Sequence, residues 1–179
     1  VGFHRYTYNK DEDAKVLINL EAAVGWEGEV EGNIVVENDS TVSGYRYSYG
    51  WAKKQKIYFT AKFSKPFVSY QLSDSIVHKE GSSLTASKVY ASFTFDKKTL
   101  NNNELLVKVA LSAVDTENAK LNMSTELASW DFDSTAKAAD DQWNTELGRL
   151  VIETDNDVQR KIFYTALYHT MIAPSKFND

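Results

Sequence analysis

Cysteine is absent from the 179 residues, and proline occurs only twice. The lack of cysteine excludes a disulfide scaffold, a cysteine-ligated zinc site and a thiol nucleophile. It does not indicate a compartment, because the cytosol and an oxidising compartment without disulfides fit equally well. No apolar run approaches the ~18 residues of a membrane-spanning helix. No segment has the pattern of a signal peptide either. We therefore expect no membrane span.

A strong positive charge is also lacking. Lysine and arginine total 20 against 25 acidic residues, which gives a net charge of −5. A nucleic-acid partner needs a basic stripe. Lys53, Lys54 and Lys56 form the densest basic run, and this run is typical of a solvated loop or an edge strand. We expect no nucleic-acid partner.

The first two-thirds of the chain has the pattern of β-strands. Residues 3–9 are rich in aromatic side chains, residues 14–24 are β-branched and apolar, and residues 55–67 alternate between apolar and polar types. Short polar turns separate these segments. Many short strands of this kind favour an antiparallel two-sheet β-sandwich, here over residues 1–114.

From residue 115 the apolar period changes from two to 3.6, which predicts helices. We place them at about 115–129, 134–150 and 156–172, with boundary errors of ~2–4 residues. Asp115 and Thr154 are suited to cap helix starts, and Pro174 ends the last helix.

An apolar stripe marks the middle helix at spacings of three and four. Trp143, Leu147 and Leu150 belong to it. We expect the stripe to pack on the sandwich and Trp143 to be buried.

The last helix is the most aromatic and apolar one, although chain termini are usually the least anchored parts of a domain. It carries Phe163, Leu167 and Met171, and a sandwich alone cannot bury all its sides. We expect an exposed apolar patch on it, as at the start of a domain that the chain does not contain. The chain also opens without Met, inside an expected strand, which suggests a fragment.

No complete catalytic or metal-binding constellation can be found from spacing. His4, His78 and His169 lie far apart, with no second ligand at metal-site spacing. The acidic pairs lie mainly at helix starts and are typical of caps. A nucleophile elbow, a phosphate-binding loop and a dinucleotide fingerprint are missing. We therefore assign no catalytic residue and no metal ligand.

One aromatic row could bind sugar. Tyr45, Tyr47, Tyr49 and Trp51 recur at period two and so share one strand face. Rigid aromatic rings can stack on the apolar faces of pyranoses. Inward faces of sandwiches are also filled in this way, and we favour the core for this row.

Several longer stretches together resemble glycoside hydrolase family 92, the calcium-dependent exo-acting α-mannosidases. They occur in the family's order and cover nearly the whole chain. These stretches are GFHRYTY, SGYRYSYGWAKKQKIYFTAKFSKPF, LLVKVALSAVDTENAKLNMSTEL, WDFD followed by QWNTELGRL, and FYTALYHTMIAPSKFND.

The resemblance implies a mainly β fold with C-terminal helices. Residues 1–114 would be a galactose-mutarotase-like supersandwich that lacks its N-terminal part. Residues 115–154 would be linker helices, and residues 155–179 the first helix of an (α/α)6 barrel whose remainder is absent.

The resemblance also implies the function of the intact enzyme. It would remove terminal α-linked mannose by inverting hydrolysis with the help of calcium, in the periplasm or outside the cell. The family's catalytic acid, base and calcium ligands belong to the barrel, so no residue here receives those roles. We expect this fragment alone to be inactive and to bind no calcium.

Four residues are candidates for contact with the substrate cleft between the domains. His169, Phe177 and Asp179 lie in the segment that leads into the barrel, and Trp51 ends an aromatic strand. Two alternatives stay open. One is a free-standing carbohydrate-binding sandwich without catalysis, and the other is a different sandwich-plus-barrel enzyme such as a glycoside phosphorylase.

Overall fold

The computed structural model describes residues 1–23, 26–50, 52–78 and 81–173. They form two compact units: Val1–Trp130, and a helical unit that begins at Asp131. The strands are β1 (Gly2–Thr7), β2 (Ala14–Asn19), β3 (Gly28–Asn38), β4 (Thr41–Tyr49), β5 (Gln55–Phe63), β6 (Phe67–Ser73), β7 (Val77–His78), β8 (Ser83–Ala86), β9 (Tyr90–Phe95) and β10 (Glu104–Ser112). The helices are α1 (Thr116–Glu126), α2 (Phe132–Leu147) and α3 (Asp157–Ile172), with two 3-10 turns, Lys97–Thr99 and Asn101–Asn103.

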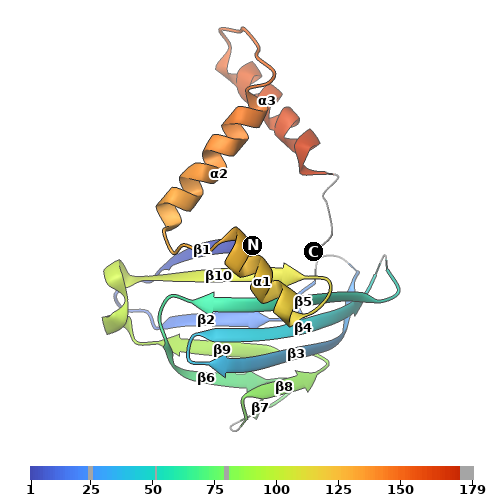
Figure 1. Cartoon of the computed structure of the whole chain (residues 1–179), viewed down its shortest axis with the longest axis vertical. Coiled ribbons are helices and arrows are strands. Elements are labelled where there is room, and N and C mark those ends of the chain that lie inside the picture. Colours follow the sequence, from blue (N-terminus) through green and yellow to red (C-terminus); the bar gives the residue numbers. More distant parts are fainter. Residues whose placement is uncertain (24–25, 51, 79–80, 174–179) are drawn as a thin grey trace. The chain divides into compact units, whose positions relative to one another are not determined.

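The strands make two antiparallel sheets packed face to face (Figure 1). We call the six-stranded one, in the order β1-β10-β5-β4-β3-β8, sheet A. Sheet B has four strands in the order β2-β9-β6-β7. The predicted fold class, a two-sheet antiparallel sandwich followed by three helices, is confirmed.

The core lies between the sheets. Phe93 and Leu72 of sheet B and Ile34 and Leu105 of sheet A are almost completely buried. Phe63, Phe67, Phe93 and Phe95 form a group of rings whose centroids lie 5.0–6.3 Å apart. Such edge and tilted arrangements are the favoured ones for aromatic pairs. This core holds the two sheets together.

Tyr45 and Tyr47 of the aromatic row do not belong to the core, so our preference for a core role of this row is wrong for them. In β4 the core side chain is Val42, and Arg46 and Ser48 share its inward face because side chains alternate along a strand. Tyr45 and Tyr47 therefore lie on the outer face of sheet A. Gly44 also points inward, where the carbonyl oxygen of Asn33 leaves no room for a side chain.

Helix α1 packs on the outer face of sheet A, across β10 and β5 (Figure 1). The Asp115 side chain accepts a hydrogen bond from the Asn118 backbone N–H and caps its start, as expected. Ala119 and Met123 of α1, and Leu127 at its C-terminal end, are buried. The helix thus belongs to the same compact unit as the strands.

The helical unit contains α2 and α3, joined by ring contacts. Trp143 of α2 meets Tyr168 of α3 edge-on, with 4.7 Å between ring centroids. Trp143 keeps 38% of its surface exposed, so the expectation that it is buried is wrong. Neither helix has a buried residue. The expected exposure on α3 is confirmed, since Met171 is 36% and Ile172 50% exposed. Among the described residues, no helix is long and apolar enough to cross a membrane.

Candidate functional surfaces

The outer face of sheet A carries a tyrosine cluster, formed by Tyr45, Tyr47 and Tyr58. The Tyr45 and Tyr47 rings stack with centroids 4.3 Å apart. Their hydroxyls are engaged, since Tyr45 Oη donates to Glu31 at 2.8 Å and Tyr47 Oη lies 3.1 Å from Tyr58 Oη. The hydrogen bond with Tyr58, together with burial, raises the pKa of Tyr47 to about 12. Tyr47 therefore keeps its phenolic proton at neutral pH.

Protein groups pack against the Tyr47 ring of the tyrosine cluster. One face of Tyr47 meets Tyr45, and the ammonium of Lys56 lies over the ring at 4.9 Å from its centroid. Sugar stacking requires a free ring face. Tyr47 is therefore part of a packed and hydrogen-bonded patch, and its contacts do not favour sugar stacking on that ring.

A buried lysine joins sheet A to the end of α1. Lys108 lies on the outer face of β10 and is only 3% exposed. Its Nζ donates to the carbonyls of Leu127 and Ala128 at 2.8 and 3.0 Å. It also lies 4.2 Å from the centroid of the Trp130 ring. Burial, and secondarily the charge of Lys62, lower the pKa of Lys108. The carbonyl and ring contacts compensate for the burial of the ammonium.

A groove of about 450 Å³ opens beside Lys108, between α1 and sheet A. Lys62, Lys108 and Lys120 line it with Glu37. Glu37 Oε1 accepts from Lys120 Nζ at 2.8 Å and from Ser43 Oγ at 2.6 Å. Burial alone would raise the pKa of Glu37, but these hydrogen bonds and the charge of Lys120 lower it. Glu37 is held as a carboxylate, in a structural ion pair.

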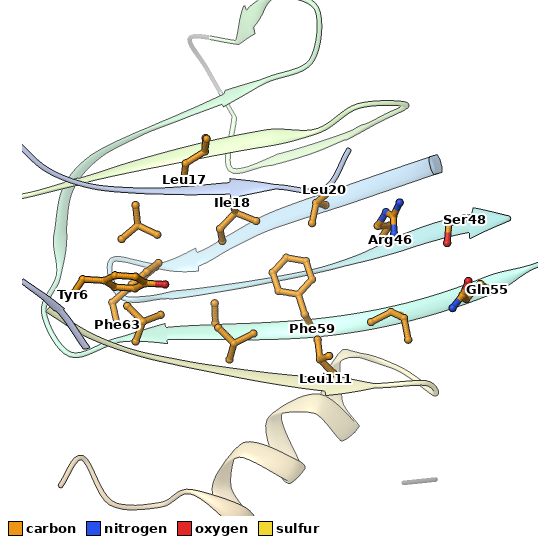
Figure 2. A pocket seen from close by; sticks show the side chains of 15 residues that line it. Tyr6, Leu17, Ile18, Leu20, Arg46, Ser48, Gln55, Phe59, Phe63 and Leu111 are labelled. Carbon is orange, nitrogen blue, oxygen red and sulfur yellow. The ribbon is translucent and has the colours of Figure 1, made fainter. Parts of the chain in front are cut away.

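A second hollow, the interior channel, lies between the sheets and has a volume of about 390 Å³. Figure 2 shows apolar side chains such as Ile18 and Phe59 along most of its length. Arg46, Ser48 and Gln55 lie together at one end. The channel is apolar with a polar end.

Family models match both parts of the chain. The glycosyl hydrolase family 92 N-terminal domain matches residues 1–112, and the catalytic domain of the same family matches residues 118–179. The chain belongs to glycosyl hydrolase family 92. The second match begins within α1, so the sequence of the catalytic domain starts on a helix that is packed against the sandwich.

Solved structures of this family share the fold. The GH92 α-mannosidase BT3965 from Bacteroides thetaiotaomicron superposes with a TM-score of 0.87 at 29% identity, over 99% of this chain and 24% of that one. The GH92 inverting mannosidase BT2199 from Bacteroides thetaiotaomicron VPI-5482 gives 0.82 at 25% identity, over 94% and 22%. The GH92 glycosyl hydrolase ccman5 shares the fold with a TM-score of 0.83 at 24% identity, over 98% and 24%. No curated protein matches the chain. The chain thus spans about a quarter of the length of these family 92 structures.

The four residues suggested for the family's substrate cleft are placed as follows. Trp51, Phe177 and Asp179 lie outside the described residues. His169 lies in the last turn of α3, exposed, with its ring centroid 5.9 Å from that of Tyr168. The structure therefore describes one of the four, and it lies in the helical unit.

A calcium ion needs six to eight oxygen ligands that converge on one point. Among residues 1–23, 26–50, 52–78 and 81–173, no three histidine, aspartate or glutamate side chains are grouped so that they could hold a metal. The described part of the chain does not fit a calcium site. No chemical step through calcium follows from these residues.

Sequence reasoning missed Lys108, Arg46 and Gln55. The sequence did contain a signal for Lys108, because it is the one charged residue in the apolar strand LLVKVAL. Such a lysine is either buried or a single polar group on an otherwise apolar strand. For Arg46 the signal was its alternation with the tyrosines, which assigned the arginine and the rings to opposite faces.

Proposed function

We propose that this chain is the N-terminal portion of a glycosidase that removes terminal α-linked mannose from glycans. The observation that carries the proposal is the succession of two family 92 models along one chain, N-terminal domain first and catalytic domain second. Two solved structures similar to the chain are those of an α-mannosidase and an inverting mannosidase. The remainder of the catalytic domain, an (α/α)6 barrel in the same polypeptide, is the proposed partner of the sandwich.

The proposed mechanism is inverting hydrolysis with calcium. Inversion requires a general acid and a water-activating base, with carboxyl groups about 6.5–9.5 Å apart on opposite sides of the glycosidic bond. We assign both carboxylates, and the calcium ligands, to the rest of the polypeptide. We further propose that the enzyme acts in the periplasm or outside the cell.

The role proposed for the sandwich is structural. It provides a rigid body on which α1 is anchored through Lys108 and three buried apolar side chains. Because α1 already belongs to the sequence of the catalytic domain, this anchor would fix where the polypeptide enters that domain. The sandwich would thereby help to shape a site that is built elsewhere.

The test compares residues 1–179 with a polypeptide extended to the full length of its relatives. We expect the long form to release mannose from an aryl α-mannoside, to lose activity to a calcium chelator and to regain it when calcium is added back. NMR of the first product formed should show the inverted anomer. Residues 1–179 should show no turnover. Turnover by the short form, or a long form that is inactive on every α-mannoside linkage, would refute the proposal.

A further inference from the structure

Two lysines lie directly opposite each other on the outer face of sheet A. Lys108 of β10 and Lys62 of β5 are cross-strand partners in the register of the sheet. Like charges in this position destabilise an antiparallel pair, whereas opposite charges stabilise it. The lowered pKa of Lys108 is caused first by burial and then by the charge of Lys62. The sheet thus holds a pair of ammonium groups that repel each other.

No acidic side chain of the described residues neutralises these two ammonium groups. Neither Lys62 nor Lys108 forms an ion pair with the part of the chain that the structure describes. Both line the groove between α1 and sheet A, together with Lys120 and Glu37. Glu37 is already engaged by Lys120 at 2.8 Å and by Ser43 at 2.6 Å. Three ammonium groups and one carboxylate leave an excess of two positive charges in this groove, although the whole chain carries −5.

The groove also contains hydroxyl and ammonium donors suited to an anion. Thr41 of β4 is the cross-strand partner of Lys62 on its other side, and Thr60 precedes Lys62 by two residues on the same face of β5. Both threonines line the groove. An ammonium group has three N–H donors, and Lys108 uses two of them on backbone carbonyls at the end of α1. The volume of about 450 Å³ leaves room for a small polyatomic anion.

We propose that this groove binds a phosphate group, held between the ammonium groups of Lys62 and Lys108 with Thr41 beside them. Lysine binds phosphate as a compact point charge. A phosphate between the two lysines replaces their repulsion by two charge-assisted contacts, which are stronger than neutral hydrogen bonds. Inorganic phosphate and a phosphomonoester present the same oxygens to these side chains, so both are used as probes. The proposal does not depend on the hydrolysis of mannosides.

The test measures the thermal unfolding of the long form while sodium phosphate replaces sodium chloride at constant ionic strength. A ligand that binds only the folded state raises the Tm in a way that depends on its concentration relative to Kd. Phosphate also stabilises proteins because it is excluded from their surface, and that effect is shared by all variants. We expect a shift of the Tm beyond this shared effect, with a half-maximal phosphate concentration that can be measured for each variant.

Three variants separate the groove from the rest of the surface. Lys62→Gln should raise the half-maximal phosphate concentration at least ~10-fold, because one charge-assisted hydrogen bond is lost. Lys62→Glu places a carboxylate opposite Lys108 and should abolish the specific shift. Lys98→Gln is the matched control, since it removes the same charge from an exposed residue of the 3-10 turn Lys97–Thr99 and should leave the phosphate response unchanged.

The outcomes are distinct. An equal phosphate response in Lys62→Gln, Lys62→Glu and Lys98→Gln would assign the shift to surface exclusion and overturn the proposal. A specific shift in residues 1–179 that is absent from the long form would mean that an acidic segment of the polypeptide fills the groove, and would also overturn it. A response to inorganic phosphate alone supports a free ion, and a response to glycerol phosphate as well supports a phosphomonoester. No mannoside is present, so a long form that binds phosphate but is inactive on mannosides would refute the proposed function alone.

Discussion

The sandwich and the helical unit bury their aromatic side chains to very different extents. In the sandwich, Phe93 is 0% exposed and is surrounded by other rings. In the helical unit, Trp143 also has a ring partner, yet 38% of its surface remains exposed. Both units have regular secondary structure with capped helices or paired strands. Regular secondary structure therefore does not by itself produce a buried core. Among the described residues, the sandwich has both and the helical unit has only the first.

The largest expected effect is in the sandwich core. Phe93→Ala should lower the free energy of unfolding by roughly 3–5 kcal/mol, because it removes a fully buried ring and leaves a cavity. Urea unfolding of residues 1–179, followed by circular dichroism of the strands, measures this. A loss below about 1 kcal/mol would mean that the inter-sheet core tolerates a void, contrary to close packing.

The next effect tests whether α1 is energetically part of the sandwich. Lys108→Ala leaves the carbonyls of Leu127 and Ala128 without their donor, and should cost about 1–3 kcal/mol. Lys62→Ala is the matched control, since Lys62 is exposed on the neighbouring strand and should change stability by less than about 0.5 kcal/mol. Equal effects of the two variants would contradict the anchoring role.

Trp143→Ala sharpens the comparison from the side of the helices. The edge-on contact with Tyr168 should contribute about 0.5–1.5 kcal/mol beyond the area that the ring buries, and the total should stay below that of Phe93→Ala because 38% of Trp143 is exposed. The loss should appear in the helical signal at low urea and leave the unfolding of the strands unchanged. A cost equal to that of Phe93→Ala would show that the ring is buried in solution. In the long polypeptide the cost should rise if the rest of the catalytic domain covers α2.

The smallest effect at neutral pH concerns the tyrosine cluster. The folded pKa of Tyr47 is about 12, above the value of about 10 for an unfolded chain. Between these pH values the unfolded state has lost the phenolic proton while the folded state keeps it. The stability that Tyr47 contributes is therefore present below about pH 10 and is lost as pH rises toward 12.

Tyr47→Phe should make this alkaline loss smaller. Unfolding by urea at about pH 9 and about pH 11 measures the difference, chosen to bracket the unfolded pKa. Tyr49→Phe is the control, because Tyr49 is 51% exposed and belongs to the same strand. An unchanged pH dependence in Tyr47→Phe would mean that the hydrogen bond with Tyr58 does not hold the phenol in its protonated form.

The elements themselves could be predicted from the sequence. The strand at residues 3–9 corresponds to β1, and the last predicted helix, 156–172, agrees with α3 to one residue at its start. Period two and period 3.6 are local properties, set by backbone geometry and by the capping preference of residues such as Asp115. Resemblance of several long stretches was enough to name the family, since their order along the chain is also a property of sequence.

The candidate surfaces could not be predicted in the same way. Period two placed Tyr45 and Tyr47 on one face, but it did not say which face would be covered by sheet B. The free energy of burying apolar area depends on what lies opposite, and the inward positions of this half of β4 carry Arg46 and Ser48 instead. Tyr45 and Tyr47 were therefore assigned to the wrong face of the strand.

The sequence by itself determined most of the strands, the three helices, the Asp115 cap and the family, because each of these depends on neighbouring residues or on the order of motifs. The cap of α3 is Asn156 and not Thr154 as expected. Only the tertiary structure decided that Lys108 is buried under the end of α1, that Tyr45 and Tyr47 face outward, and that Leu111 on β10 is 55% exposed. The physical reason is that burial is a property of two surfaces that meet. A strand's pattern describes only one of them.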